Sequence, residues 1–117
     1  MRGVRGAVTV NEDLPREIIR VTKKLLEAVI EENSIQEEEL VSMCFTATSD
    51  LKSEYPSVAA RKMGFTGVPL LNFQEMEVEG SLPHCIRLLV YIDRNCSLEE
   101  INHIYLGEAK SLRPDLA

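Results

Sequence analysis

The stretch "PHCIRLLVYID", residues 83–93, is typical of a buried β-strand and contains one residue that does not fit, Arg87. Apolar side chains, from Ile86 to Ile92, surround it in sequence. A guanidinium is always charged, and burying one without a partner is costly in free energy. Two explanations therefore remain open: Arg87 reaches solvent from an edge strand, or an anion meets it inside a cleft.

Side chains alternate across a strand, so this stretch has two faces. Cys85, Arg87, Leu89 and Tyr91 share one face, and the purely aliphatic residues at 86, 88, 90 and 92 share the other. The anion that meets Arg87 is either a protein carboxylate or a ligand. Glu75 is the obvious carboxylate, but it lies among several acids in "NFQEMEVE", where a solvated turn glutamate is the simpler interpretation.

The flanking sequence predicts a mixed α/β fold with five strands and one dominant helix. Strands are expected at 3–10, 41–48, 68–73 and 84–92, with a last strand or hairpin from "HIYL" and "AKSL" (103–106 and 109–112). The long helix is expected to start near Asp13, a candidate cap, with Pro15 in its first turn, and to run to Asn33. A short helix from 55 to 64 should end at Gly64. Capping-box spacing predicts two further short helices, at Ser34–Glu37 and at Ser97–Glu100.

One long helix cannot cover both faces of a five-stranded sheet. The second face must therefore be buried in another way, and copies of the same chain are the expected partner.

Composition narrows the class of protein. The chain has 117 residues, which suits a single domain over 1–117. The net charge of −6 and pI of about 4.9 disfavour general binding to nucleic acid or to a membrane surface. Three cysteines without CxxC spacing fit a reducing compartment, and no stretch has the composition of a signal peptide or membrane helix. We expect a soluble cytoplasmic protein.

Several side chains are candidates for a site, although none names a reaction. Arg5 lies off the valine face of the first strand and could converge with Arg87 if their strands are neighbours; alone, it is better interpreted as a solvated arginine. Tyr105 fits the edge of a core, and Arg61 fits a solvated helix face. His84 and His103 lack a third ligand at metal spacing, so no metal site is expected.

Five motifs span nearly the whole chain in a fixed order: "RGVRGAVTV", "TATSDL…YPSVAAR", "VPLLNFQEMEVEGSLPHCIR", "HIYL" and "LRPDL". In this order they resemble the monofunctional bacterial chorismate mutases of the trimeric, barrel-like class. The resemblance implies a pseudo-α/β-barrel homotrimer with active sites in clefts between subunits. It implies conversion of chorismate to prephenate in aromatic amino-acid biosynthesis, by a [3,3] rearrangement that requires no cofactor.

The resemblance also assigns site residues. The two essential arginines fall on Arg5 and Arg87, the site glutamate on Glu75 and the site tyrosine on Tyr105. Two further groups follow from it: the pocket-lining segment Leu71, Asn72, Phe73, Gln74 and Glu75, and two positions presented by a neighbouring subunit, Tyr55 and Arg61.

Three positions depart from some relatives. Tyr55 stands where some have phenylalanine, Val58 where some have lysine, and Asn72 where some have cysteine. The effect of Asn72 depends on whether its backbone or its side chain meets the ligand.

The competing hypothesis is a trimeric protein similar to the reactive-imine deaminases, or a non-catalytic binder of small anions. Either would need Arg87, but not Arg5, Glu75 and Tyr105 together.

Overall fold

The computed structural model describes residues 1–115; residues 116 and 117, the end of the predicted domain and of the "LRPDL" motif, lie outside the described part. The elements are β1 (Arg2–Thr9), α1 (Pro15–Glu32), η1 (Glu37–Glu39), β2 (Leu40–Ala47), α2 (Ser57–Lys62), β3 (Leu70–Gln74), β4 (Cys85–Ile92), η2 (Leu98–Glu100), β5 (Ile104–Leu106) and η3 (Gly107–Leu112). The predicted class, a mixed five-stranded sheet with one long helix, is confirmed.

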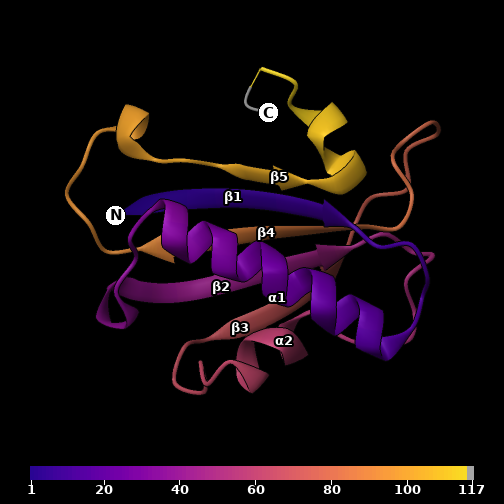
Figure 1. The fold of residues 1–117 in the computed structure, drawn as a ribbon, viewed down its shortest axis with the longest axis horizontal. Helices are drawn as coiled ribbons and strands as arrows, with labels where there is room; N and C mark the ends of the chain where they lie inside the picture. Colours follow the sequence, from indigo (N-terminus) through magenta and orange to yellow (C-terminus); the bar gives the residue numbers. More distant parts are fainter. Residues whose placement is uncertain (116–117) are drawn as a thin grey trace.

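The strands follow the order β3-β2-β4-β1-β5 (Figure 1). β4 lies in the middle and pairs antiparallel with both β1 and β2. The outer strands pair parallel to their neighbours, β3 with β2 and β5 with β1. Because β4 is central, the edge-strand explanation of Arg87 is wrong.

α1 crosses one face of the sheet and buries it (Figure 1). Pro15 occupies the first turn, where its missing N–H costs nothing, and the apolar residues recur on one side of the helix. Gly6 of β1 permits close contact, because a Cβ there would lie 3.0 Å from Cδ1 of Leu25. The side chains that form this core include Val4, Ile18, Leu25, Val29, Met43, Phe45, Ile86, Val90 and Ile92.

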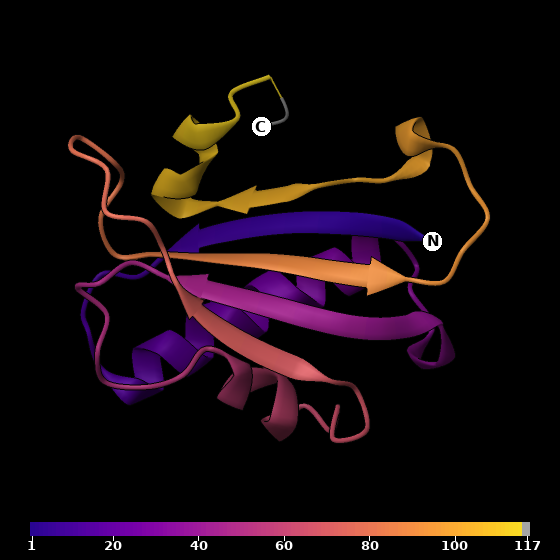
Figure 2. The same cartoon turned by 180° about the vertical axis from the view of Figure 1, so that it is seen from behind.

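No helix crosses the opposite face in the described part of the chain (Figure 2). We call it the open face. Among residues 1–115, only η3 packs beside one end of it, where Ala109 meets Ala7 and Cys85. Large apolar side chains remain exposed nearby, including Leu71, Phe73, Met76 and Val78. The expectation that the sheet is covered on one side only is confirmed within the described residues.

The predicted cap of the long helix is wrong. Leu14 precedes the first helical residue, and no side chain caps the helix there. The carboxylate of Asp13 instead accepts hydrogen bonds from the backbone N–H groups of Lys52 and Ser53 and from the Ser53 hydroxyl. The bond from Ser53 is the main reason that the pKa of Asp13 is lowered. Asp13 therefore fastens the loop that leads to Tyr55.

The capping boxes also differ from their predicted positions. Glu39, not Glu37, reaches back, and its carboxylate accepts from the backbone N–H of Gln36, while Ser34 adopts a left-handed φ of 47°. Ser97 precedes η2 without a side-chain hydrogen bond to it. Residues 109–112 belong to the helical turn η3 rather than to a hairpin, because Gly107, at a φ of 60°, turns the chain out of β5. Gly64, at a φ of 97°, follows α2 as predicted.

Candidate active site

Arg87 and Glu75 form an ion pair on the open face. Nε of Arg87 lies 3.2 Å from Oε2 of Glu75, and the two side chains are 49% and 24% exposed. The terminal nitrogens of Arg87 donate no hydrogen bond to an oxygen of residues 1–115. The carboxylate partner anticipated from the sequence is therefore present, and Nε is the guanidinium nitrogen that faces it.

Glu75 is fixed to β2 through both its backbone and its side chain. Its N–H donates to the carbonyl of Ala47 at 2.9 Å. Its Oε2 accepts from the Thr46 hydroxyl at 2.5 Å. The interpretation of Glu75 as a solvated turn residue is wrong, because β3 runs parallel to β2 and brings the end of β3 beside Thr46.

Arg5 reaches the same region from β1. β1 lies between β4 and β5, so Arg5 is one strand away from Arg87 and also from Tyr105. Its backbone N–H donates to Nδ1 of His103 at 2.9 Å. Partial burial, with Arg5 and Arg113 nearby, lowers the pKa of His103 below its ordinary value of 6.5, and the neutral ring accepts this bond.

These side chains line one cavity of about 520 Å³ on the open face. Arg5, Arg87 and Arg113 line its wall together with Glu75, and Asp115 pairs with Arg113 at 3.0 Å. Three cations thus face two carboxylates, so the cavity is locally positive although the chain carries a net charge of −6. A cavity of this size with a few convergent polar groups suits a small anionic ligand. The wall consists of Arg5, Gly6, Ala7, Cys44, Thr46, Glu75, Arg87, Leu88, Leu89, Tyr105, Leu112 and Arg113.

Eight of these wall residues were not predicted as site residues: Cys44, Thr46, Leu89, Leu112, Arg113, Gly6, Ala7 and Leu88. A signal existed for the first two, because the alternation in "VSMCFTAT" already placed Cys44 and Thr46 on the mildly polar face of their strand. Arg113 and Leu112 belong to the "LRPDL" motif, which the resemblance highlighted without a role. η3 brings them back to the sheet.

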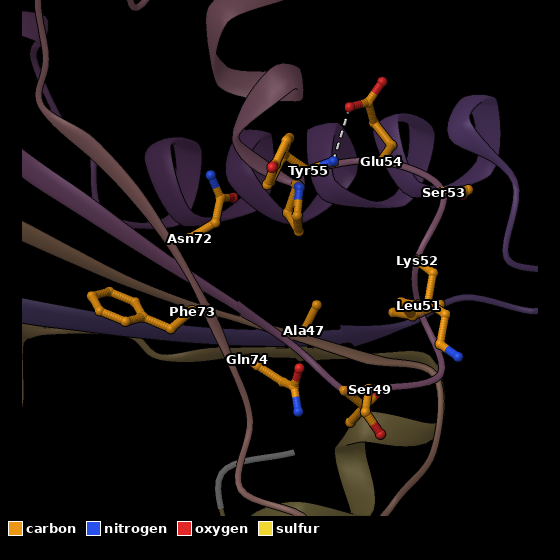
Figure 3. A pocket seen from close by; sticks show the side chains of 12 residues that line it. Ala47, Ser49, Leu51, Lys52, Ser53, Glu54, Tyr55, Asn72, Phe73 and Gln74 are labelled. Carbon is orange, nitrogen blue, oxygen red and sulfur yellow. Dashed lines mark hydrogen bonds between the residues drawn. The ribbon is translucent and has the colours of Figure 1, made fainter.

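A second cavity, of about 440 Å³, lies between β3 and the loop that joins β2 to α2 (Figure 3). Tyr55, which is 65% exposed, lines the cavity from the loop, and Asn72, Phe73 and Gln74 line it from β3. Within one chain, most of the predicted site residues therefore divide between two cavities. The first contains Arg5 and Arg87, and the second contains most of the "LNFQE" segment.

The side chain of Asn72 is engaged by the protein. Its Nδ2 donates to Oγ of Ser57 at 2.8 Å, and its Oδ1 accepts from the Ser57 N–H at 3.1 Å. These bonds tie β3 to the start of α2, just after Tyr55. The side chain of Asn72 is therefore engaged within the chain.

Two predicted site residues line neither cavity. Leu71 is 59% exposed on β3, and its register partner Cys44 lies on the open face. Arg61 projects from α2, where Nη2 lies 3.5 Å from the Ser57 hydroxyl. One chain does not bring Arg61 to Arg87.

Within residues 1–115, no three side chains of the types that bind metals gather into a group, and no helix has the length and apolarity needed to cross a membrane.

The chain matches the family model for chorismate mutase type I over residues 1–116. It is 47% identical to the chorismate mutase AroH of Thermus thermophilus, an alignment that covers 99% of this chain and 96% of the relative. It is 42% identical to the chorismate mutase AroH of Bacillus subtilis, over 100% and 93% of the two chains. The solved structure of a chorismate mutase from Clostridium thermocellum superposes with a TM-score of 0.93 at 38% identity, covering 95% and 99% of the two chains.

Proposed function

The chain belongs to the chorismate mutase type I family and is an isomerase, and we propose that its 520 Å³ cavity binds chorismate and rearranges it to prephenate. The observation that carries this proposal is the convergence of Arg5, Glu75, Arg87 and Tyr105 in one wall. The competing hypotheses, a deaminase-like protein or a simple anion binder, need Arg87 alone and leave the other three without a purpose.

The reaction is a unimolecular rearrangement in which the ether C–O bond of chorismate breaks while a C–C bond forms. No proton is transferred, and neither a metal nor a cofactor is required. The protein therefore acts in two ways: it holds the enolpyruvyl arm over the ring, and it places fixed charge where charge develops.

Arg87 is proposed to stabilise the ether oxygen. As the C–O bond lengthens ahead of C–C bond formation, that oxygen gains negative charge. The Nε of Arg87 faces Glu75, and its terminal nitrogens are proposed to donate to the substrate. A planar fork can serve the ether oxygen and a carboxylate at once, which the point charge of a lysine cannot do. Because β4 is the central strand, the charge is held on rigid backbone.

The other three side chains are proposed to orient the substrate. Arg5 binds the side-chain carboxylate, with help from the Tyr105 hydroxyl. Glu75 accepts a hydrogen bond from the ring hydroxyl. The positive wall of the cavity suits a substrate that is a dianion.

We further propose a homotrimer with sites shared between subunits. The open face exposes apolar side chains that a partner would bury, and the site residues of one chain lie in two separate places. Packing of one subunit's second-cavity region against its neighbour's first cavity would unite them, so that Tyr55, Arg61 and the segment from Leu71 to Gln74 complete the neighbour's site. Each chain would contribute a single domain. A cytoplasmic location is proposed because the three cysteines are free.

The first test follows the loss of chorismate absorbance with purified protein and no added cofactor, with the mass in solution measured in parallel by light scattering. We expect turnover by a particle of three chains. A folded trimer that leaves chorismate unchanged would favour the competing hypotheses, and an active monomer would contradict shared sites.

A second test combines two impaired variants. Arg87→Ala and Arg61→Ala chains, co-expressed with different tags and purified as mixed trimers, should regain activity, because one of the three sites in each mixed trimer receives an unsubstituted Arg87 from one chain and an unsubstituted Arg61 from the other. About a third of the wild-type activity should therefore return. Arg87→Ala mixed with Arg5→Ala is the matched control: both residues come from the same wall, so activity should stay low. Equal outcomes in the two mixtures would overturn the shared site.

A further inference from the structure

Glu75 needs an external support, because it lies just beyond the end of β3 and not within the strand. Its backbone is fastened to Ala47, but the sheet does not orient its side chain, which has three rotatable bonds. Arg87 is a weak support: the ion pair is half-exposed on the arginine side, and such pairs contribute little to ordering a side chain. Arg87 must also turn its donors toward the substrate.

Thr46 supplies a firmer contact. It lies on β2 directly opposite Arg87 of β4, and the two residues share the open face. Its hydroxyl donates to Oε2 of Glu75, the same oxygen that faces Nε of Arg87. β-branching restricts Thr46 at χ1, so the hydroxyl is held by a stiff side chain on a strand of the sheet.

The two oxygens of Glu75 consequently have different surroundings. Oε2 is occupied by Thr46 and Arg87, whereas Oε1 accepts no hydrogen bond from residues 1–115. An ionised carboxylate only accepts, so Oε1 is the oxygen left for a hydroxyl of the ligand.

We propose that Thr46 is a positioning residue of the active site: its hydroxyl locks Glu75 so that Oε1 faces the substrate and Arg87 keeps its terminal nitrogens free. The inference rests on the roles proposed above for Glu75 and Arg87. Thr46 itself need not touch the reacting atoms, and its effect should pass through Glu75.

The test is a double-mutant cycle with Thr46→Val and Glu75→Gln, measured as kcat and KM for chorismate. Thr46→Val removes the hydroxyl at nearly constant shape, and we expect kcat to fall by about 10- to 100-fold, because small misplacement of a reacting or binding group costs up to about 10²-fold. KM should change less than kcat. In the Glu75→Gln background, the same substitution should have little further effect.

Two variants separate positioning from folding. Thr46→Ser restores the hydroxyl and should return most of kcat. Thr22→Val makes the same chemical change at a buried position of α1, far from the cavity, and should leave kcat unchanged.

Wild-type kcat in Thr46→Val, or equal losses from that change with and without Glu75, would overturn the inference while leaving the proposed function intact. Wild-type kcat in Glu75→Gln would instead remove the proposed role of Glu75, and the inference with it.

Discussion

The two faces of the sheet are built from the same strands and have opposite characters. On the side of α1, β4 and the part of β1 from Val4 onward present aliphatic residues or glycine, and Val4, Ile86 and Val90 among them are fully buried. On the open face, one residue along in each strand, they present Arg5 and Arg87. Because successive side chains of a strand point to opposite faces, the residues that stabilise the core and the residues that line the cavity are neighbours in sequence. Substitutions on the two faces should therefore affect different measurements.

The largest effect on stability is expected on the covered face. Leu25 of α1 is fully buried, and Leu25→Ala should lower the free energy of unfolding by about 2–5 kcal/mol, because the lost contacts leave a cavity. Denaturant unfolding measures this change. The kcat of molecules that remain folded should stay close to wild type. Lys24→Ala, at the exposed neighbouring position, should change stability by less than about 0.5 kcal/mol. If Leu25→Ala lowered kcat as well as stability, the two faces would not have separate roles.

The largest effect on rate is expected on the open face. Arg87→Ala removes a preorganised donor and should lower kcat by about 10²–10³-fold. Its melting temperature should stay near that of the wild type, since a half-exposed ion pair contributes about 1 kcal/mol or less. Chorismate absorbance and thermal unfolding report the two quantities. Near-normal turnover would refute the proposed role, and a large drop in melting temperature would show that Arg87 also supports the fold.

A smaller effect should appear with pH at the boundary between β1 and β5. The folded state lowers the pKa of His103, mainly through partial burial, so stability from this group is present above its ordinary pKa of 6.5 and is lost as pH falls through the lower folded value. In the folded state, protonation would also remove the acceptor for the Arg5 N–H. His103→Asn keeps an acceptor that does not titrate. Melting temperatures measured from pH 7.5 to 5 should fall more steeply for the wild type than for this variant; parallel curves would count against the assignment.

The smallest effect concerns the one buried side-chain polar atom that lacks a partner in the described residues, Oγ1 of Thr22. Thr22→Val replaces an unsatisfied hydroxyl with a methyl group of similar size. Stability should rise by up to about 1 kcal/mol, because no hydrogen bond is lost and a desolvation cost disappears. Denaturant unfolding would detect it. If Thr22→Val instead lowered the free energy of unfolding by more than about 1 kcal/mol, the hydroxyl would have a hydrogen-bond partner.

Periodicity was enough to predict the strands, the long helix and the uncovered face, because each depends on which side chains avoid water. It could not place β4 in the centre, since strand order depends on pairing between distant segments. For the same reason, Glu75 looked like a solvated turn residue until β3 was found beside β2. The predicted caps at Asp13 and Ser34 were wrong because a carboxylate or hydroxyl can accept from any nearby N–H, not only from one in the helix that follows. The carboxylate of Asp13 accepts instead from the N–H groups of Lys52 and Ser53.

The grouping of Arg5, Arg87, Glu75 and Tyr105 came from the family resemblance rather than from spacing, and the cavity wall agrees with it. Thr46 was passed over because threonine is common in strands and one hydroxyl on a polar face has many uses. Only its distance to Glu75 distinguishes it.

The position of β1 has a consequence for how the protein is made. The first strand of the chain pairs with β4 and with β5, whose residues lie near the other end. During translation, its valines leave the ribosome long before either partner exists, and the nascent chain carries an unpaired apolar strand meanwhile. Arg5 and Tyr105, two residues of the cavity wall, come together only after β5 has been synthesised. We therefore expect folding to be slow for the size of the domain, and late.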